Sequence, residues 1–288
     1  MTEIAEVVEG SNVVLPDYTG HTFSDKQISS GSHRSFVSGT GGSWEEDGRA
    51  QLTFLQQQRL RPHHTMLDIG CGALRAGRHF VDYLDAGNYY GIDANQQLIQ
   101  IGYDQELNDE QRAKLPAEHL RANDRFNSDF GATFDMAIAQ SVFTHVSLNH
   151  MRLCMYRLAK VMAPGGTFFA SYFEVPSDKP IDYHYKKWEG GRTYFYEKNV
   201  YWYHRSDLEW VAGDQWTTRY LGPYGSSHDQ VMMAYTRVSD EEIEASNAAT
   251  AREVARKRQV SATIRAGGPR SLIVRARRKA SNIISPYS

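Results

Sequence analysis

Short apolar runs alternate with amphipathic stretches through the middle of the chain. The apolar runs predict strands over residues 65–69, 88–92, 119–123, 133–139 and 167–173. Between them, apolar residues recur at helical spacing and predict helices over residues 74–84, 95–103 and 148–162. The last helix carries the stripe Met151, Met155, Leu158 and Met162, and Pro164-Gly165-Gly166 follows as a stop signal. Strands that alternate with helices in this way are typical of an α/β fold with a doubly wound sheet.

Polar and turn-rich segments flank this alternation. Residues 1–42 are rich in Gly, Ser and Thr and predict an irregular polar arm. Ser43-Trp44-Glu45-Glu46 is a capping box, which predicts a helix to about Leu60 with Leu52, Leu55 and Gln56 facing inward. A second box at Ser206-Asp207-Leu208-Glu209 predicts a short helix. The runs 217–221 and 230–236, joined by Gly222-Pro223-Tyr224-Gly225, then predict a hairpin.

These signals divide the chain into three parts. Residues 1–42 form the arm, and residues 43–238 form the main domain. Residues 239–288 form a basic helical extension, which begins at a third capping box, Ser239-Asp240-Glu241-Glu242.

The strand at 65–69 ends in glycines, and the next strand ends in an acid. Gly70 and Gly72 allow a tight turn and a close approach of the backbone to a ligand. Asp93, about 20 residues further on, is placed to accept hydrogen bonds from a ribose, as in nucleotide-binding βαβ units. A dinucleotide fingerprint would have a third glycine where Arg75 stands. Asp68 would repel a pyrophosphate but suits a cationic ligand such as an amino-acid ammonium group.

At these residues the chain resembles the class I S-adenosylmethionine-dependent methyltransferases. The resemblance begins at Leu67-Asp68-Ile69-Gly70-Cys71-Gly72 and continues through Asp93 and Asn123-Asp124. It also takes in Phe134-Asp135-Met136-Ala137-Ile138-Ala139-Gln140 and Met162-Ala163-Pro164-Gly165-Gly166-Thr167, so that it covers roughly residues 44–238. It implies a Rossmann-like, mostly parallel sheet of seven strands that ends in an antiparallel hairpin.

The same resemblance assigns roles around S-adenosyl-L-methionine. Asp68, Gly70 and Gly72 would hold its methionine end, with Arg75 as a carboxylate partner, and Asp93 would bind the ribose hydroxyls. Asp124, with Asn123, would contact the adenine edge, and Gln140 would border the pocket. The helix from Ser43 would lie over the cofactor, which makes Trp44 and Gln51 candidate pocket walls. For Trp44, a role as a core anchor is an equal alternative.

Methyl transfer to oxygen also needs a group that accepts the acceptor's proton. His145 follows the fourth strand in Ser141-Val142-Phe143-Thr144-His145, and histidine titrates near neutrality. It is the preferred candidate base, although a packing or capping role competes equally. His204 is the second candidate and His184 the third.

Residues 174–205 interrupt the alternation with a long connection dense in aromatic side chains. Such a loop in a compact domain is commonly functional, and its place after the fifth strand is where α/β sheets bind ligands. Aromatic faces stack on sugars while their polar tips form hydrogen bonds. The predicted acceptor contacts are therefore Tyr183, Tyr185, Trp188, Tyr201, Trp202 and Tyr203. Cys-rich or His-rich metal patterns are absent from this loop, and we predict no metal ligands. The alternative is that these aromatics only fill a lid.

Charge is distributed unevenly along the chain. Residues 251–288 hold ten basic residues and one acid, a net charge of +9; because the whole chain carries -2, the remainder carries -11. Within residues 270–284, Ile273, Ala276, Ala280, Ile283 and Ile284 share one face of a basic amphipathic pattern. This indicates peripheral contact with a membrane, with a solvated extension as the default alternative. Nucleic acid is disfavoured because the acidic body would repel a phosphate backbone.

Together, these observations predict a methyltransferase that methylates a hydroxyl on a sugar, glycolipid or other small molecule. The alternatives are an N- or C-methyltransferase of natural-product biosynthesis and a non-catalytic binding protein that keeps the cofactor fold. Two cysteines, Cys71 and Cys154, and the absence of a signal peptide indicate a cytoplasmic protein. No pattern specifies an oligomeric state.

Overall fold

The computed structural model describes residues 20–39, 43–176, 178–179, 184–186, 193–195, 200–225 and 228–265. The chain divides into two units, Met1–Val238 and Ser239–Ser288, and each is described by itself.

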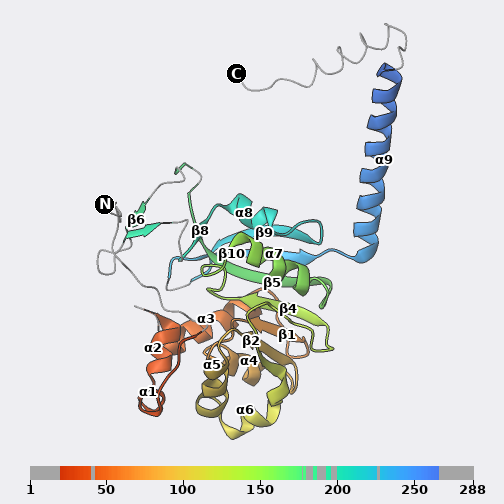
Figure 1. Ribbon diagram of the computed structural model, residues 1–288. Helices are drawn as coiled ribbons and strands as arrows, with labels where there is room; N and C mark the ends of the chain where they lie inside the picture. The colour runs from red at the N-terminus through yellow and green to blue at the C-terminus, as the bar shows by residue number, and fades with distance from the viewer. Residues whose placement is uncertain are drawn as a thin grey trace, which may run out of the picture. The chain divides into compact units, whose positions relative to one another are not determined.

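A twisted central sheet organises the first unit (Figure 1). Its strands lie in the order β3-β2-β1-β4-β5-β10-β9. Their bounds are β1 Met66–Ile69, β2 Tyr89–Asp93, β3 Leu120–Ala122, β4 Phe134–Ala139, β5 Met162–Glu174, β9 Trp216–Pro223 and β10 Val231–Arg237. Strands β1 to β5 pair in parallel, whereas β10 is antiparallel to both β5 and β9. The predicted mostly parallel sheet with a closing antiparallel hairpin is therefore confirmed.

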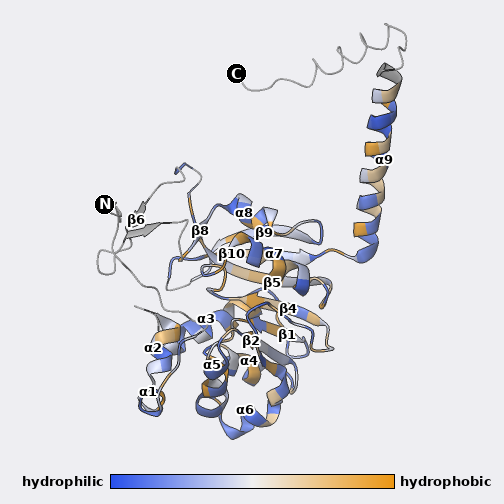
Figure 2. Cartoon of the chain, viewed as in Figure 1, coloured by the Kyte–Doolittle hydropathy of each residue, from blue (hydrophilic) through white to orange (hydrophobic). Residues whose placement is uncertain are grey.

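Helices cover both faces of this sheet. They are α3 Trp44–Gln57, α4 Gly77–Tyr83, α5 Gln96–Ile101, α6 Asp109–Lys114, α7 Leu148–Leu158 and α8 Arg205–Trp210. Leu67 and Ile69 of β1 share a core with α7 and α8, whereas Met66 shares a second core with α3 and α4. Alternate residues of a strand point to opposite faces, so Asp68 lies on the α3–α4 side. Figure 2 shows that hydrophobic residues concentrate in the central strands.

Several element boundaries differ from the sequence prediction, most of all between α7 and β5. Helix α7 ends at Leu158, so Met162 belongs to β5 and not to the helical stripe. Pro164-Gly165-Gly166 lies inside β5, where the pairing with β4 is irregular and Gly165 has a φ of 79°. On α3, Gln56 is exposed, and Phe54 takes the buried position beside Leu55.

The prediction of an irregular arm is wrong for residues 25–38. Two short helices, α1 (Asp25–Ser29) and α2 (Ser32–Ser38), form there. Their few apolar residues pack against Ala73, Leu98 and Ile101 of the main domain. The side chain of Gln97 bonds both the N–H and the carbonyl of Phe23, at 2.7 and 2.8 Å. A small apolar set within a polar segment was therefore enough to order it.

The aromatic connection contains three short strands. β6 (His184–Lys186) and β7 (Thr193–Phe195) pair antiparallel, and β8 (Trp202–Tyr203) pairs in parallel with the last two residues of β5. Tyr183 and Trp188 lie outside the described residues.

Unit 2 contains helix α9, Asp240–Arg265, whose N-terminus has the predicted capping box. Glu242 N–H donates to Ser239 Oγ at 3.2 Å, and Ser239 N–H donates to Glu242 Oε2 at 3.0 Å. Among the described residues, no helix combines the length and the apolar character needed to cross a membrane. Residues 270–284 lie outside the described residues.

Candidate active site

The glycine turn after β1 is hydrogen-bonded to the end of β2. The N–H groups of Gly70 and Cys71 both donate to the carbonyl of Ile92, at 2.7 and 3.0 Å. Gly70 has a φ of 77°, and a Cβ on it would lie 2.3 Å from Val142 Cγ2. Glycine is therefore required at position 70 by both backbone conformation and space.

Asp93 ties the turn to β2 through its side chain. Its Oδ2 accepts from Gly72 N–H at 2.9 Å, and its Oδ1 accepts from Asn95 N–H at 2.7 Å. Burial raises the pKa of this carboxyl, and the backbone donors oppose the shift. Each carboxylate oxygen has a second lone pair, so Asp93 can still accept hydrogen bonds from a diol.

Asp68 points into the α3–α4 layer and is 4% exposed. Its Oδ2 accepts from the Tyr89 hydroxyl at 2.9 Å. Burial, opposed by this hydrogen bond, raises the pKa of Asp68 to about 7. Burial also raises the pKa of the Cys71 thiol well above its ordinary value, so this cysteine stays protonated.

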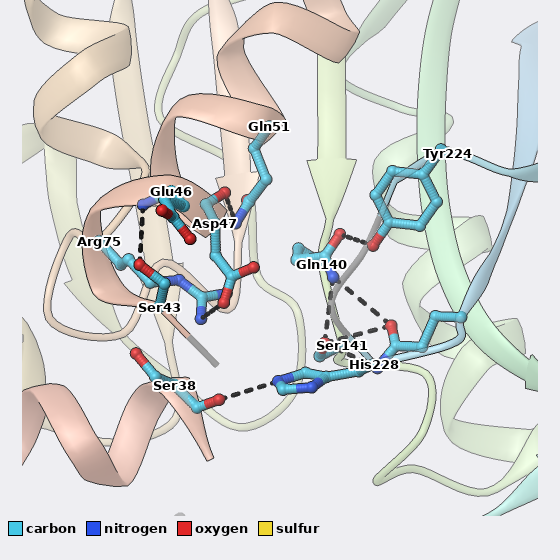
Figure 3. A network of polar contacts seen from close by, with 11 residues as sticks. Ser38, Ser43, Glu46, Asp47, Gln51, Arg75, Gln140, Ser141, Tyr224 and His228 are labelled. Carbon is cyan, nitrogen blue, oxygen red and sulfur yellow. Dashed lines mark hydrogen bonds and ion pairs between the residues drawn. The ribbon is translucent and has the colours of Figure 1, made fainter. Parts of the chain in front are cut away.

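A small pocket opens beside this turn, with an empty volume of about 250 Å³ that includes open solvent. Its lining comes from α3, the segment before α4, the end of β4 and the β9–β10 connection: Asp47, Ala50, Gln51, Arg75, Gln140, Tyr224 and His228. Asp47 and Gln51 are one turn apart on α3, and Figure 3 shows Asp47 pointing at Arg75. Arg75 Nη1 and Asp47 Oδ2 are 3.5 Å apart, and Arg75 is only 8% exposed.

The residues after β4 are held by a second polar cluster (Figure 3). Gln140 Oε1 accepts from the Tyr224 hydroxyl. Ser141 adopts a φ of 60°, and Gln230 fixes it by donating to its Oγ at 2.9 Å. Gln230 Oε1 in turn accepts from Ser171 Oγ at 2.6 Å. This cluster determines how the chain leaves β4 toward His145.

Part of this arrangement lies in a segment that matches known proteins. Residues 67–168 match a family model described as a methyltransferase domain. This match covers about a third of the chain and includes the glycine turn, Asp93 and strand β4.

Solved structures share the methyltransferase fold at low sequence identity. An amino pentose methyltransferase from Micromonospora echinaspora, involved in calicheamicin biosynthesis, is 16% identical with a TM-score of 0.51; the match covers 76% of this chain and 100% of that one. An S-adenosylmethionine-dependent methyltransferase from Clostridium acetobutylicum is 10% identical with a TM-score of 0.51, and the match covers 74% of this chain and 99% of that one. A glycopeptide N-methyltransferase is 13% identical with a TM-score of 0.50, and the match covers 66% of this chain and 90% of that one.

S-adenosylmethionine, the cofactor that the sequence resemblance implies, would find suitable partners at both ends of the glycine turn. Asp93 retains acceptor capacity for ribose hydroxyls. In the pocket, Arg75 Nη1 and Asp47 Oδ2 are buried and have no hydrogen-bond partner. Charged atoms left unsatisfied in this way fit a ligand that brings charges of its own.

The remaining predicted cofactor contacts lie along the same edge. Asn123 N–H donates to the carbonyl of Asp93 at 2.8 Å, which brings the two residues together. The Asn123 side chain bonds the backbone of Asn127, so it shapes a local turn. Asp124 is exposed. Gln140 borders the pocket, whereas Trp44 does not line it and instead packs near His33, Arg34 and Arg78.

The first two candidate bases occupy different settings, and the third, His184, is described only as part of β6. His145 is half-buried in the turn between β4 and α7. His204 is the N-cap of α8, and its N–H donates to Asp207 Oδ2 at 3.0 Å. The predicted start of this helix at Ser206 is therefore wrong: the capping box is His204 with Asp207.

Residues 201–203, which include strand β8, fix the turn that carries His145. Tyr201 N–H donates to the carbonyl of Thr144, and the Tyr203 hydroxyl donates to that of Val146, both at 2.7 Å. The aromatic segment thus grips the turn on either side of His145. Tyr203 is 8% exposed, whereas Tyr201 and Trp202 are half-buried. Trp202 stacks on Phe173 with ring centroids 4.7 Å apart. Tyr185 is described only as part of β6.

Sequence reasoning missed four pocket residues, Asp47, Ala50, Tyr224 and His228. Asp47 had a usable signal, since it precedes Gln51 by four residues on the predicted helix and therefore shares its face. Tyr224 and His228 had none, because they reach the pocket only through the hairpin that returns along β10.

Proposed function

We propose that this methyltransferase methylates a hydroxyl group on a sugar, a glycolipid or another small molecule. The observation that carries the proposal is the turn after β4. It holds the half-buried His145 between two hydrogen bonds from the aromatic segment. Histidine is suited to accept an alcohol proton near neutral pH, and aromatic side chains suit a sugar face.

The cofactor supplies an activated methyl group on a sulfonium. Gly70, Gly72 and Asp93 would hold the cofactor, which would supply its methyl group to the acceptor oxygen and leave as a neutral thioether. His145 would accept the hydroxyl proton and release it to water. The protein's other contribution is to align the methyl donor with the acceptor hydroxyl. The hydrogen-bonded glycine turn and the hydrogen-bonded His145 turn would hold the two reactants in place.

The proposed contacts divide between cofactor and acceptor. Gly70 and Gly72 let the backbone approach the cofactor closely, Asp93 accepts hydrogen bonds from the ribose hydroxyls, and Gln140 borders the methionine end. Asn123 and Asp124 are proposed near the adenine. Tyr183, Tyr185, Trp188, Tyr201 and Trp202 are proposed for the acceptor. Tyr203 supports the turn through its bond to Val146.

Cofactor binding and acceptor chemistry are tested separately. Calorimetric titration with S-adenosylhomocysteine should show micromolar binding that Asp93→Ala abolishes, while exposed Asp124→Ala reports whether the adenine assignment holds. Circular dichroism must show that Asp93→Ala remains folded, because Asp93 also binds two backbone amides.

Acceptors are then screened with methyl-labelled cofactor against glycans, glycolipids and small phenols. NMR of the product identifies the methylated atom. Label on oxygen supports the proposal; label on nitrogen or carbon replaces it with the alternative methyltransferase classes. Cofactor binding without transfer to any acceptor would favour a binding protein.

His145→Gln should lower kcat by about 100- to 10,000-fold and leave S-adenosylhomocysteine affinity unchanged. An unchanged kcat would remove His145 from the mechanism.

For location, we propose a cytoplasmic enzyme that meets anionic membranes through residues 270–284. The support is the sequence pattern, in which a basic face accompanies an isoleucine-rich one. A membrane-borne acceptor would account for both the aromatic segment and this extension.

A further inference from the structure

The pocket beside the glycine turn contains a buried ion pair that the fold does not complete. Arg75 Nη1 lies 3.5 Å from Asp47 Oδ2, beyond normal hydrogen-bond length, and both atoms are buried without a hydrogen-bond partner. Burial lowers the pKa of Arg75, with Asp47 opposing the shift. Removing two charges from water without full pairing is costly, so the arrangement is favoured when a ligand completes it.

We propose that Asp47 and Arg75 form a clamp for an α-amino acid group, and that this group is the methionine end of the cofactor. Asp47 takes the ammonium and Arg75 takes the carboxylate. An α-amino acid carries both charges on one carbon, which suits two opposite charges held side by side. The inference rests on the proposed function because it uses the same cofactor.

The position of the pair supports this assignment. Arg75 follows the glycine turn by three residues, and Asp47 reaches the same place from α3. The two elements are in close contact, since a Cβ on Gly48 would lie 2.5 Å from the carbonyl oxygen of Arg75. The clamp is therefore formed by backbone packing and does not depend on flexible side chains alone.

Asp68 is a poorer partner for the ammonium, although its place in the sequence suggests that role. Its carboxyl accepts from Tyr89, and the pocket lining does not include it. Asp47 lies in the lining with a buried oxygen that has no hydrogen-bond partner. The structure thus assigns the ammonium to a helix residue outside the glycine motif.

The test compares ligands that lack one charge at a time. Calorimetry measures the affinity of the full chain for S-adenosylhomocysteine, for its analogue without the amino group, for its analogue without the carboxylate, and for 5′-methylthioadenosine. Asp47→Asn should weaken S-adenosylhomocysteine binding by about 10- to 100-fold but leave the analogue without the amino group unaffected. Arg75→Met should show the same loss and spare the analogue without the carboxylate.

Glu46→Gln is the matched control, since it removes one exposed carboxylate from the neighbouring position of α3. Retained methylthioadenosine binding shows that a variant is folded and that the nucleoside site is intact. The clamp is overturned if Asp47→Asn and Arg75→Met bind all four ligands like wild type, or if Asp68→Asn alone shows the loss specific to the amino group. Failure of wild type to bind any of them would instead overturn the proposed function.

Discussion

At the residue scale, the site is built from carboxylates in unlike surroundings. Asp93 sits among backbone N–H donors, Asp68 is enclosed with Tyr89, and Asp47 faces the pocket. In our proposal, the same functional group serves as a ribose acceptor at Asp93, a buried structural group at Asp68 and an ammonium partner at Asp47. Environment separates these roles more strongly than sequence position does.

Asp68 gives a prediction in pH. Its folded pKa of about 7 lies above the ordinary 3.8, so the folded state holds a proton that the unfolded state releases. Its contribution to stability is full below about pH 4 and is lost as pH rises toward 7, a change on the order of 4 kcal/mol. Asp68→Asn should remove this component while keeping an acceptor for Tyr89.

Urea unfolding of wild type and Asp68→Asn across pH 4–7 measures the contribution of Asp68 to the free energy of unfolding. The difference in unfolding free energy between the two proteins should shift steadily in favour of the variant as pH rises. A difference that stays constant with pH would show that Asp68 titrates normally.

At the element scale, two anchors fix segments around the site. Glu106 ends a π-helical turn, Gly102–Glu106, and its Oε1 binds His33 Nε2 at 2.6 Å and Arg34 Nε at 2.7 Å. These contacts hold α2, whose Val37 lies within 4 Å of where a Cβ on Gly72 would be. The N-terminal helices thus reach the glycine turn through one buried carboxylate.

Replacing that carboxylate should loosen the helices. Glu106→Gln should raise amide hydrogen exchange across residues 20–39 and lower the free energy of unfolding by about 1–3 kcal/mol, because it weakens two charge-assisted hydrogen bonds. Exposed Glu110→Gln on α6 is the charge-matched control. If exchange in residues 20–39 is the same in both variants, Glu106 is not the anchor.

His204 gives the second prediction at this scale. His204 is the N-cap of α8, so His204→Ala should lower the free energy of unfolding by about 1 kcal/mol. His204→Ser should restore most of this loss. Chemical denaturation of the two variants measures this. A His204→Ser enzyme that is fully stable but has lost methyl transfer would make His204 the base in place of His145.

Element order could be predicted from the sequence because burial on both faces gives parallel strands continuous apolar runs, such as Met66-Leu67 and Ile138-Ala139. The glycine turn and Asp93 could be found because their spacing is local. Helices α1 and α2 could not, since their stability comes from contacts more than 70 residues away, as between Phe23 and Gln97. His228 and Tyr224 were missed for the same reason.

At the scale of the whole molecule, net charge differs between two parts of the sequence. Residues 1–250 carry a net charge of -11, whereas residues 251–288 carry +9. Near an anionic membrane each lysine or arginine contributes about 1 kcal/mol, and the effect falls off within a Debye length. The extension could therefore hold the enzyme at a surface that its body alone would avoid.

Vesicle flotation of the full chain tests this. Binding should require anionic lipid and should weaken with added salt. Changing Arg275, Arg277, Arg278 and Lys279 to glutamine should reduce binding strongly, by about five-fold for each charge that contacts the surface. The matched control changes Arg252, Arg256, Lys257 and Arg258 to glutamine in α9, with the same loss of charge outside the amphipathic segment.

A larger effect from residues 275–279 requires that the isoleucine face enters the interface, so Ile283→Ser with Ile284→Ser should weaken binding without any change in charge. Equal losses from the two charge variants would mean that net charge alone attracts the chain, and no binding by wild type would leave the extension as a solvated segment.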